Sequence, residues 1–68
     1  MEKEKIGVDA RKIWQMLMEK GELKISDLSK YSKMEIADIY MALGWLAKEE
    51  KVDFFKIENE AAVCLYSW

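Results

Sequence analysis

The sequence predicts an α+β fold made of three helices, a short strand between the first and second helix, and a C-terminal β-hairpin. Two features indicate this fold. Apolar residues recur at helical spacing as far as Glu50, and from Lys51 the period changes to two, in segments rich in β-branched and aromatic residues. With 68 residues, the chain has room for a single domain over 1–68 and one hydrophobic core.

The first helix is expected from about Val8 to Lys20, after a flexible N-terminal tail at residues 1–6. Gly21 follows at the position where a left-handed C-cap ends a helix. The next segment, ELKI, alternates apolar and charged residues, which predicts a short strand. The apolar stripe of the first helix consists of Ile6, Ala10, Ile13, Trp14, Leu17 and Met18.

Two capping patterns place the second and third helices. Ser26 is a favourable N-cap for a short second helix that continues to about Tyr31, whose side chain should face inward. Ser32 and Glu35 match the S-x-x-E pattern of a capping box, so a third helix is expected after Ser32. The helical period then continues to about Glu50.

The third helix is apolar on both sides. At about 100° per residue, the predicted core side consists of Ile36, Ile39, Tyr40, Leu43, Leu46 and Ala47. The opposite side carries Met34, Asp38, Met41, Trp45 and Glu49. Such a helix is normally buried on both sides. Gly44 costs ~1 kcal/mol relative to alanine inside a helix, which predicts that it allows a close backbone approach. We therefore expect a second contact surface at Met41 and Trp45, covered either by the chain's own hairpin or by a partner.

The predicted hairpin shows a similar surplus of apolar residues. Its strands are separated by Glu58–Glu60, and its inner face should carry Val52, Phe54, Val63 and Leu65. The other face then carries Phe55, Ile57, Cys64, Tyr66 and Trp68. An ordinary antiparallel hairpin buries one face and exposes the other, so this second apolar face predicts an interaction surface. The alternative is that the N-terminal segment near Ile6 covers it.

The short link around Ser32 is typical of a helix-turn-helix, and a hairpin after the third helix makes the predicted fold a winged helix-turn-helix. Three runs, IWQML at Ile13–Leu17, ISDLSKYS at Ile25–Ser32 and ALGWLAKEEKV at Ala42–Val52, carry a resemblance. The chain resembles a small winged helix-turn-helix family of bacteria and archaea whose function is uncharacterised. The resemblance covers nearly the whole chain and implies this fold and a dimer. It supplies no catalytic or binding residues.

The composition excludes most catalytic and metal chemistry. The chain has no histidine and one cysteine, Cys64, so it can form no Cys-His nucleophile pair, no Cys/His zinc site and no intrachain disulfide. The three glycines are scattered and form no phosphate-binding loop. We therefore expect no enzyme activity, no metal and no cofactor. No apolar run is long enough to span a membrane, and the lone cysteine without an export signal predicts a cytoplasmic protein.

The charge distribution disfavours DNA binding. The formal net charge is −2, whereas nucleic-acid-binding domains are usually clearly basic. The third helix contains no arginine, asparagine or glutamine, which read base edges most often. The wing tip, Glu58–Glu60, is acidic. The candidate DNA contacts are Lys24, Lys30, Lys33, Lys48 and Lys56.

Two hypotheses for function therefore follow. The preferred one is a non-enzymatic module for protein–protein interaction and homodimerisation, within transcription regulation, because methionine and aromatic residues are enriched at interfaces. Its candidate interface residues are Met41, Trp45, Phe55, Ile57, Tyr66 and Trp68. The alternative is a transcription regulator that binds DNA directly through the third helix and the wing.

Overall fold

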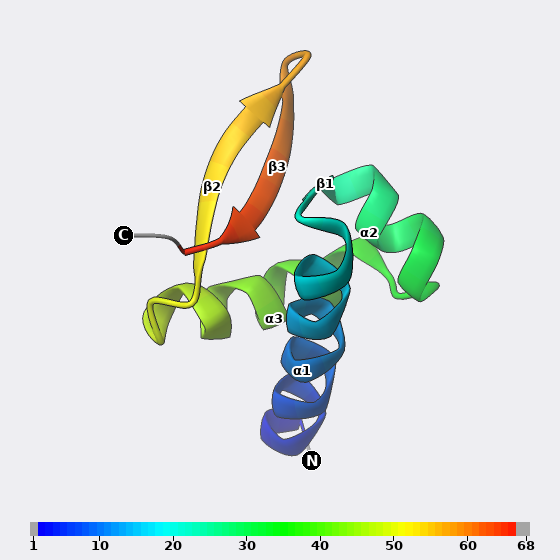
Figure 1. Ribbon diagram of the computed structural model, residues 1–68. Helices are drawn as coiled ribbons and strands as arrows, with labels where there is room; N and C mark the ends of the chain where they lie inside the picture. Colours follow the sequence, from blue (N-terminus) through cyan, green and yellow to red (C-terminus); the bar gives the residue numbers. More distant parts are fainter. Residues whose placement is uncertain (1, 67–68) are drawn as a thin grey trace.

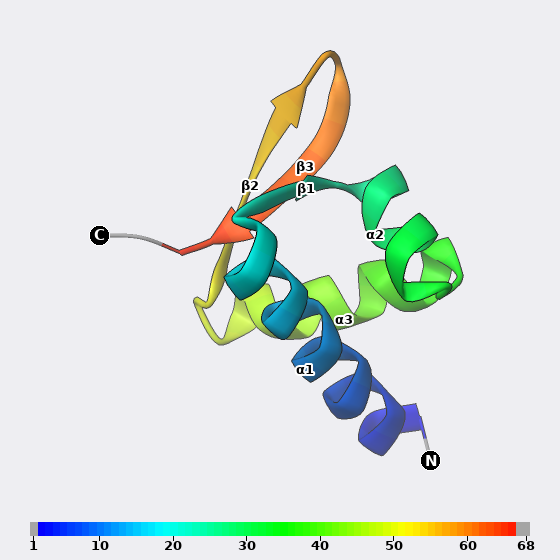
Figure 2. The same ribbon diagram turned by 45° about the vertical axis from the view of Figure 1, so that its right-hand side comes forward.

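A computed structural model describes residues 2–66, with side chains from Glu4 onward. The elements in chain order are α1 (Glu2–Lys20), β1 (Glu22–Lys24), α2 (Ile25–Ser32), α3 (Ile36–Lys48), β2 (Val52–Ile57) and β3 (Glu60–Leu65). Figures 1 and 2 show the three helices packed together, with the β2–β3 hairpin extending away from them. The α+β winged helix-turn-helix fold predicted from the sequence is confirmed.

The three strands form one antiparallel sheet in the order β1-β3-β2. In this register Leu23 lies opposite Val63, and Val63 lies opposite Phe54. Glu58 and Asn59 form the hairpin turn with φ values of 54° and 69°. Two consecutive residues with positive φ are typical of the tight two-residue turn that matches the twist of a hairpin. Because β3 is the central strand, β2 lies at one edge of the sheet.

The core lies between α1, α2, α3 and the inner face of the sheet. Its largest fully buried side chains are Ile13, Leu17, Leu28, Ile39, Leu43 and Val63. Full burial of one such side chain contributes roughly 1.5–3 kcal/mol. Ile13 and Leu17 belong to the apolar stripe predicted for the first helix, so the predicted spacing in the middle of α1 is correct.

The helix α1 begins earlier than predicted. It starts at Glu2, whereas the sequence predicted a start near Val8 and a flexible tail at residues 1–6. Lys5 explains part of this difference, because its Nζ atom lies 2.8 Å from Asp9 Oδ2 and 3.1 Å from Asp38 Oδ2. The first contact is an i,i+4 pair within α1 and the second holds α1 against α3. The other end of the helix agrees with the prediction, since Gly21 has a φ of 90° and donates its N–H to the Leu17 carbonyl.

The predicted caps of α2 and α3 are wrong. The helix α2 begins at Ile25, and the N–H of Ser26 is bound by the Glu60 carboxylate from β3, at 3.0 Å. Ser32 is the last residue of α2, where its hydroxyl contacts the Leu28 carbonyl. The helix α3 begins only at Ile36, so no capping box forms between residues 32 and 35. It also ends before Glu50, at Lys48.

The core side of α3 is rotated by roughly 50° from the predicted one, at 100° per residue. Ile36 and Tyr40 were predicted to be buried and are exposed, whereas Ala42 is fully buried. The buried side consists of Ile39, Ala42, Leu43 and Leu46. Two further residues predicted to face the core, Met18 and Tyr31, are also exposed. Each lies in the last turn of its helix, and Tyr31 lies under the Lys20 ammonium, which is 5.0 Å from the ring centroid.

The hairpin also differs from its predicted faces. Phe54 shares a face with the buried Val63 but is 48% exposed, because β2 is an edge strand of a hairpin that extends beyond the helices. On the other face, Phe55 and Ile57 are partly buried. The N-terminal segment near Ile6 does not cover the hairpin, since both ribbon views place the start of α1 at the far end of the molecule from the wing.

Candidate interaction surface

One side of α3 presents a continuous apolar surface, which we call the α3 face. Its four large residues are half exposed: Ile36 at 44%, Tyr40 at 52%, Met41 at 46% and Trp45 at 40%. Ala37 and Gly44 are exposed between them. These residues lie in two adjacent i,i+4 rows, so they form one surface on one side of the helix. The structure thus places the predicted interface residues Met41 and Trp45 together with Gly44 and adds Ile36, Ala37 and Tyr40, which sequence analysis had not assigned to an interface.

Gly44 has no role in packing the chain against itself. A Cβ atom added at Gly44 would meet no atom within 4 Å, and the residue does not have a positive φ. The close backbone approach predicted for this position is therefore not made within the chain. Glycine in a helix lowers the stability of the helix by ~1 kcal/mol relative to alanine. No contact of Gly44 within the chain offsets this loss of stability.

The charged residues of α3 lie at its ends or are already paired. Asp38 is the partner of Lys5 on α1. Lys33 precedes the helix and Lys48 ends it, roughly 20 Å apart at 1.5 Å per residue. Between them the α3 face carries no charged side chain. The side of α3 that would enter a DNA groove therefore lacks both the cations that contact phosphates and the amides that read bases.

The wing tip is held against the junction of β1 and α2 by two acidic residues. Lys24 Nζ donates to Glu58 Oε1 at 3.0 Å, and this hydrogen bond raises the pKa of Lys24. Hydrogen bonds from the hydroxyl and the N–H of Ser26 lower the pKa of Glu60. Of the candidate DNA contacts, Lys24 is therefore already neutralised, whereas Lys30, Lys33, Lys48 and Lys56 are exposed. They lie on α2, at the two ends of α3 and on β2, so the structure does not gather them into one basic patch on a single element.

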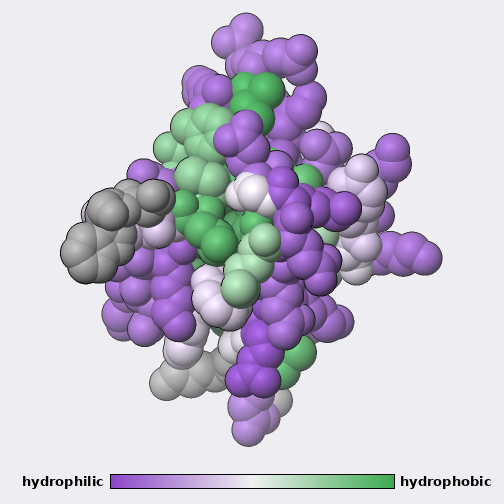
Figure 3. Space-filling view, in the orientation of Figure 1, coloured by the Kyte–Doolittle hydropathy of each residue, from purple (hydrophilic) through white to green (hydrophobic). Residues whose placement is uncertain are grey.

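Two of the predicted interface residues of the hairpin, Phe55 and Ile57, lie apart from the α3 face. Phe55 and Ile57 lie on β2, which leads away from α3 (Figure 1). Tyr66 is 44% exposed, and Trp68 lies outside the described residues. Figure 3 shows a further apolar area over the hairpin, bordered by hydrophilic side chains. The exposed Phe54 belongs to the hairpin and had been assigned to the core.

The surroundings of Cys64 favour the protonated thiol. Burial raises its pKa, and the neighbouring carboxylates of Asp53 and Glu22 raise it further. The thiolate is the nucleophilic form, so these surroundings disfavour nucleophilic catalysis. Within residues 2–66, no group of three or more acidic or cysteine side chains is arranged to hold a metal ion. No helix in this part of the chain is long and apolar enough to cross a membrane.

Comparison with known proteins agrees with this architecture. A family model described as a winged helix-turn-helix domain (DUF2582) matches residues 1–65. The chain belongs to the DUF2582 family of winged helix-turn-helix domains. The solution NMR structure of protein BT2368 from Bacteroides thetaiotaomicron is similar to this DUF2582 domain, with a TM-score of 0.84 and 28% identity over 96% of this chain and 79% of that chain.

HlyU from Vibrio cholerae N16961 shares the fold of this DUF2582 domain. Its TM-score is 0.75, at 22% identity over 91% of this chain and 73% of that chain. Among curated proteins, no match to the sequence was found. The resemblance inferred from the sequence is thus confirmed at the level of the family. The residues of the candidate interaction surface are assigned from the structure and not from these relatives.

Proposed function

We propose that this DUF2582 domain is a non-enzymatic interaction module that forms a homodimer through the α3 face and acts in transcription regulation. The observation that carries the proposal is the exposed apolar surface around Gly44 on the helix that a winged helix-turn-helix normally presents to DNA. The fold supports a role in transcription regulation only by analogy. The composition of the surface is the physical argument for a protein partner.

A second copy of the chain suits the α3 face because a two-fold interface must be complementary to itself. An uncharged surface meets this condition without placing like charges opposite each other. Tyrosine, tryptophan and methionine, the large residues of its central part, are enriched at interface cores. With Gly44 near the two-fold axis, the two α3 backbones could approach more closely than with any other residue at that position.

The size of the domain also favours a partner. A standard interface buries about 800 Å² on each side, roughly a sixth of the 4961 Å² accessible surface of this chain. The α3 face and the residues flanking it supply the centre of such an area. Chains below ~70–80 residues usually need support beyond a single core, and the lone cysteine cannot supply an intrachain disulfide. Burial of the α3 face would supply that support.

Direct DNA binding is the second candidate function. It is supported by the fold and by Lys30, Lys33 and Lys48, which are exposed on α2 and at the ends of α3. The α3 face between these cations is apolar, and the acidic residue Glu58 neutralises Lys24 at the wing. In a dimer formed through α3, these lysines would also have to reach DNA around the interface. The homodimer is therefore the better supported function.

The test of the homodimer is the mass of the chain in solution, measured by light scattering at high micromolar concentration. We expect a dimer for the unmodified chain and a monomer for Met41→Lys, since the charge would be buried in the interface. Met18→Lys is the matched control, because Met18 is an exposed methionine on α1 outside the α3 face. A monomeric unmodified chain would refute the proposal. Titration with duplex DNA at low salt tests the alternative, and amide shifts in α3 and the wing would support it.

A further inference from the structure

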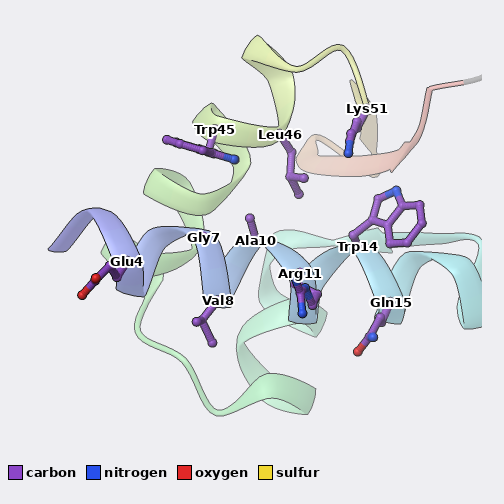
Figure 4. A pocket seen from close by; sticks show the side chains of 10 residues that line it. All are labelled: Glu4, Gly7, Val8, Ala10, Arg11, Trp14, Gln15, Trp45, Leu46 and Lys51. Atoms are coloured by element: carbon purple, nitrogen blue, oxygen red, sulfur yellow. The ribbon is translucent and has the colours of Figure 1, made fainter. Parts of the chain in front are cut away.

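An open groove of about 830 Å³ lies between the N-terminal half of α1, the C-terminal half of α3 and Lys51 (Figure 4). Its floor includes Gly7 and Ala10 of α1. The close-up shows Trp45 above the Gly7 end, and Trp14 at the opposite end beneath Lys51. Volumes of about 300–1,000 Å³ are typical of sites for small molecules. The size and the two indole rings thus suit a small planar ligand.

The floor of the groove is open because its residues are small. A Cβ atom added at Gly7 would meet nothing within 4 Å. Ala10 is buried, and Figure 4 shows its methyl group directed towards α3. The helix α1 therefore approaches α3 near Ala10 and leaves space beside Gly7, below the indole of Trp45. An aromatic ring in this space would contact the Trp45 side chain.

The charged groups of the groove favour an anion. Lys51 Nζ lies 5.8 Å from the centroid of the Trp14 ring, and Arg11 also lines the groove. Neither cation makes an ion pair with another residue in the described part of the chain. Glu4 is the one carboxylate in the lining. The groove therefore carries a net positive charge in a chain whose formal net charge is −2.

We propose that this groove binds a small molecule in which a planar apolar ring is joined to a carboxylate. The ring lies over Gly7 against Trp45, where stacking between aromatic rings is favourable. The carboxylate is directed towards the Lys51 end, where a charge-assisted hydrogen bond to Lys51 orients it. This site adjoins the dimer interface proposed above and shares Trp45 with it, whereas Gly7, Trp14 and Lys51 belong to the groove alone.

The ligand test uses 2-naphthoate as the probe and 2-naphthamide as its uncharged match. The isotope-labelled full chain is titrated with each, and the amide and indole N–H signals are followed by NMR. We expect 2-naphthoate to shift the indole signals of Trp14 and Trp45 and the amide of Gly7. The uncharged 2-naphthamide should bind about fivefold more weakly than 2-naphthoate, because it cannot make the partly exposed charge contact. Equal affinities for the two probes, or shifts confined to other residues, would overturn the proposal.

Two variants and their controls locate the site. Gly7→Leu fills the groove and favours the helix, so it should retain the folded structure and weaken 2-naphthoate binding more than about tenfold. Lys51→Gln should remove the preference for the carboxylate, whereas Lys12→Gln, an exposed lysine of α1 outside the groove, should leave it unchanged. Unaltered binding by Gly7→Leu would contradict the proposal.

The same titration separates the groove from the dimer interface. Met41→Lys lies outside the groove, so it should bind 2-naphthoate as the unmodified chain does. Loss of binding in this variant would show that the dimer forms the site and would refute a groove made by one chain. Shifts of the Gly7 and Trp14 signals on simple dilution, without the probe, would identify a second copy as the occupant of the groove and would also refute the proposal.

Discussion

Replacement of Gly44 by alanine should have opposite effects on the single chain and on the dimer. In the single chain, the added Cβ atom enters open space and the residue remains helical, so helix propensity should stabilise the fold by ~1 kcal/mol. For a domain of this size, that corresponds to an increase in Tm of about 4–8 °C. In the proposed dimer the same methyl group meets the partner's α3. Overpacking of a close contact typically costs about 1–3 kcal/mol, which corresponds to a dimer that is roughly 5- to 150-fold weaker.

The two effects can be measured separately. Thermal unfolding in a Met41→Lys background, where the chain is expected to be monomeric, reports the gain in helix stability. Sedimentation velocity over a dilution series reports the dissociation constant of the dimer. Gly7→Ala is the matched control, because it also lies in a helix and its Cβ would also meet nothing. It should increase Tm by a similar amount and leave dimerisation unchanged. If Gly44→Ala dimerises as tightly as the unmodified chain, the inferred close approach at Gly44 is refuted.

Three further predictions concern the core, the wing and α1. Leu43→Ala should lower the free energy of unfolding by about 2–5 kcal/mol, since Leu43 is fully buried, and urea unfolding measures this loss. The pKa of Glu60 is lowered in the folded chain, so its ionised carboxylate stabilises the fold at pH values above 4.5, the ordinary pKa of the group. This contribution is lost as the pH falls through the lowered pKa of the folded chain. Glu60→Gln should therefore lower Tm at neutral pH and have little effect near pH 3; an equal loss at both pH values would contradict the assignment. Lys5→Gln should increase hydrogen exchange in the first turns of α1, and unchanged exchange there would show that its two ion pairs do not hold the helix.

Local patterns in the sequence were sufficient for the order of the elements and for much of the core. Ile13 and Leu17 recur at helical spacing, and they are fully buried in the structure. Gly21 ends α1 in the left-handed conformation expected of a C-cap. The change of period at Lys51 correctly predicted a hairpin. These features depend on neighbours close in the sequence, so that local physical rules apply to them directly.

The start of α1, the capping of α2 and the rotation of α3 depended on contacts between distant segments. Lys5 contacts Asp38 on another helix, and Glu60 caps α2 from 34 residues away. The helix α3 is apolar on more than one side, so its periodicity alone does not specify which residues α1 covers. For this reason Ile36 and Tyr40 were assigned to the core.

The candidate surfaces were likewise predictable where they depend on local spacing and not where they depend on contacts between distant segments. Met41 and Trp45 were predicted to form a second apolar surface, because they lie opposite the strongest core positions of the same helix. The full α3 face became visible only after the packing of α1 had determined the rotation of α3. The groove could not be predicted at all, because its walls come from α1, α3 and Lys51. The sequence by itself determined which residues are apolar and at what spacing, and the tertiary structure decided which of them remain exposed, since burial depends on contacts between elements far apart along the chain.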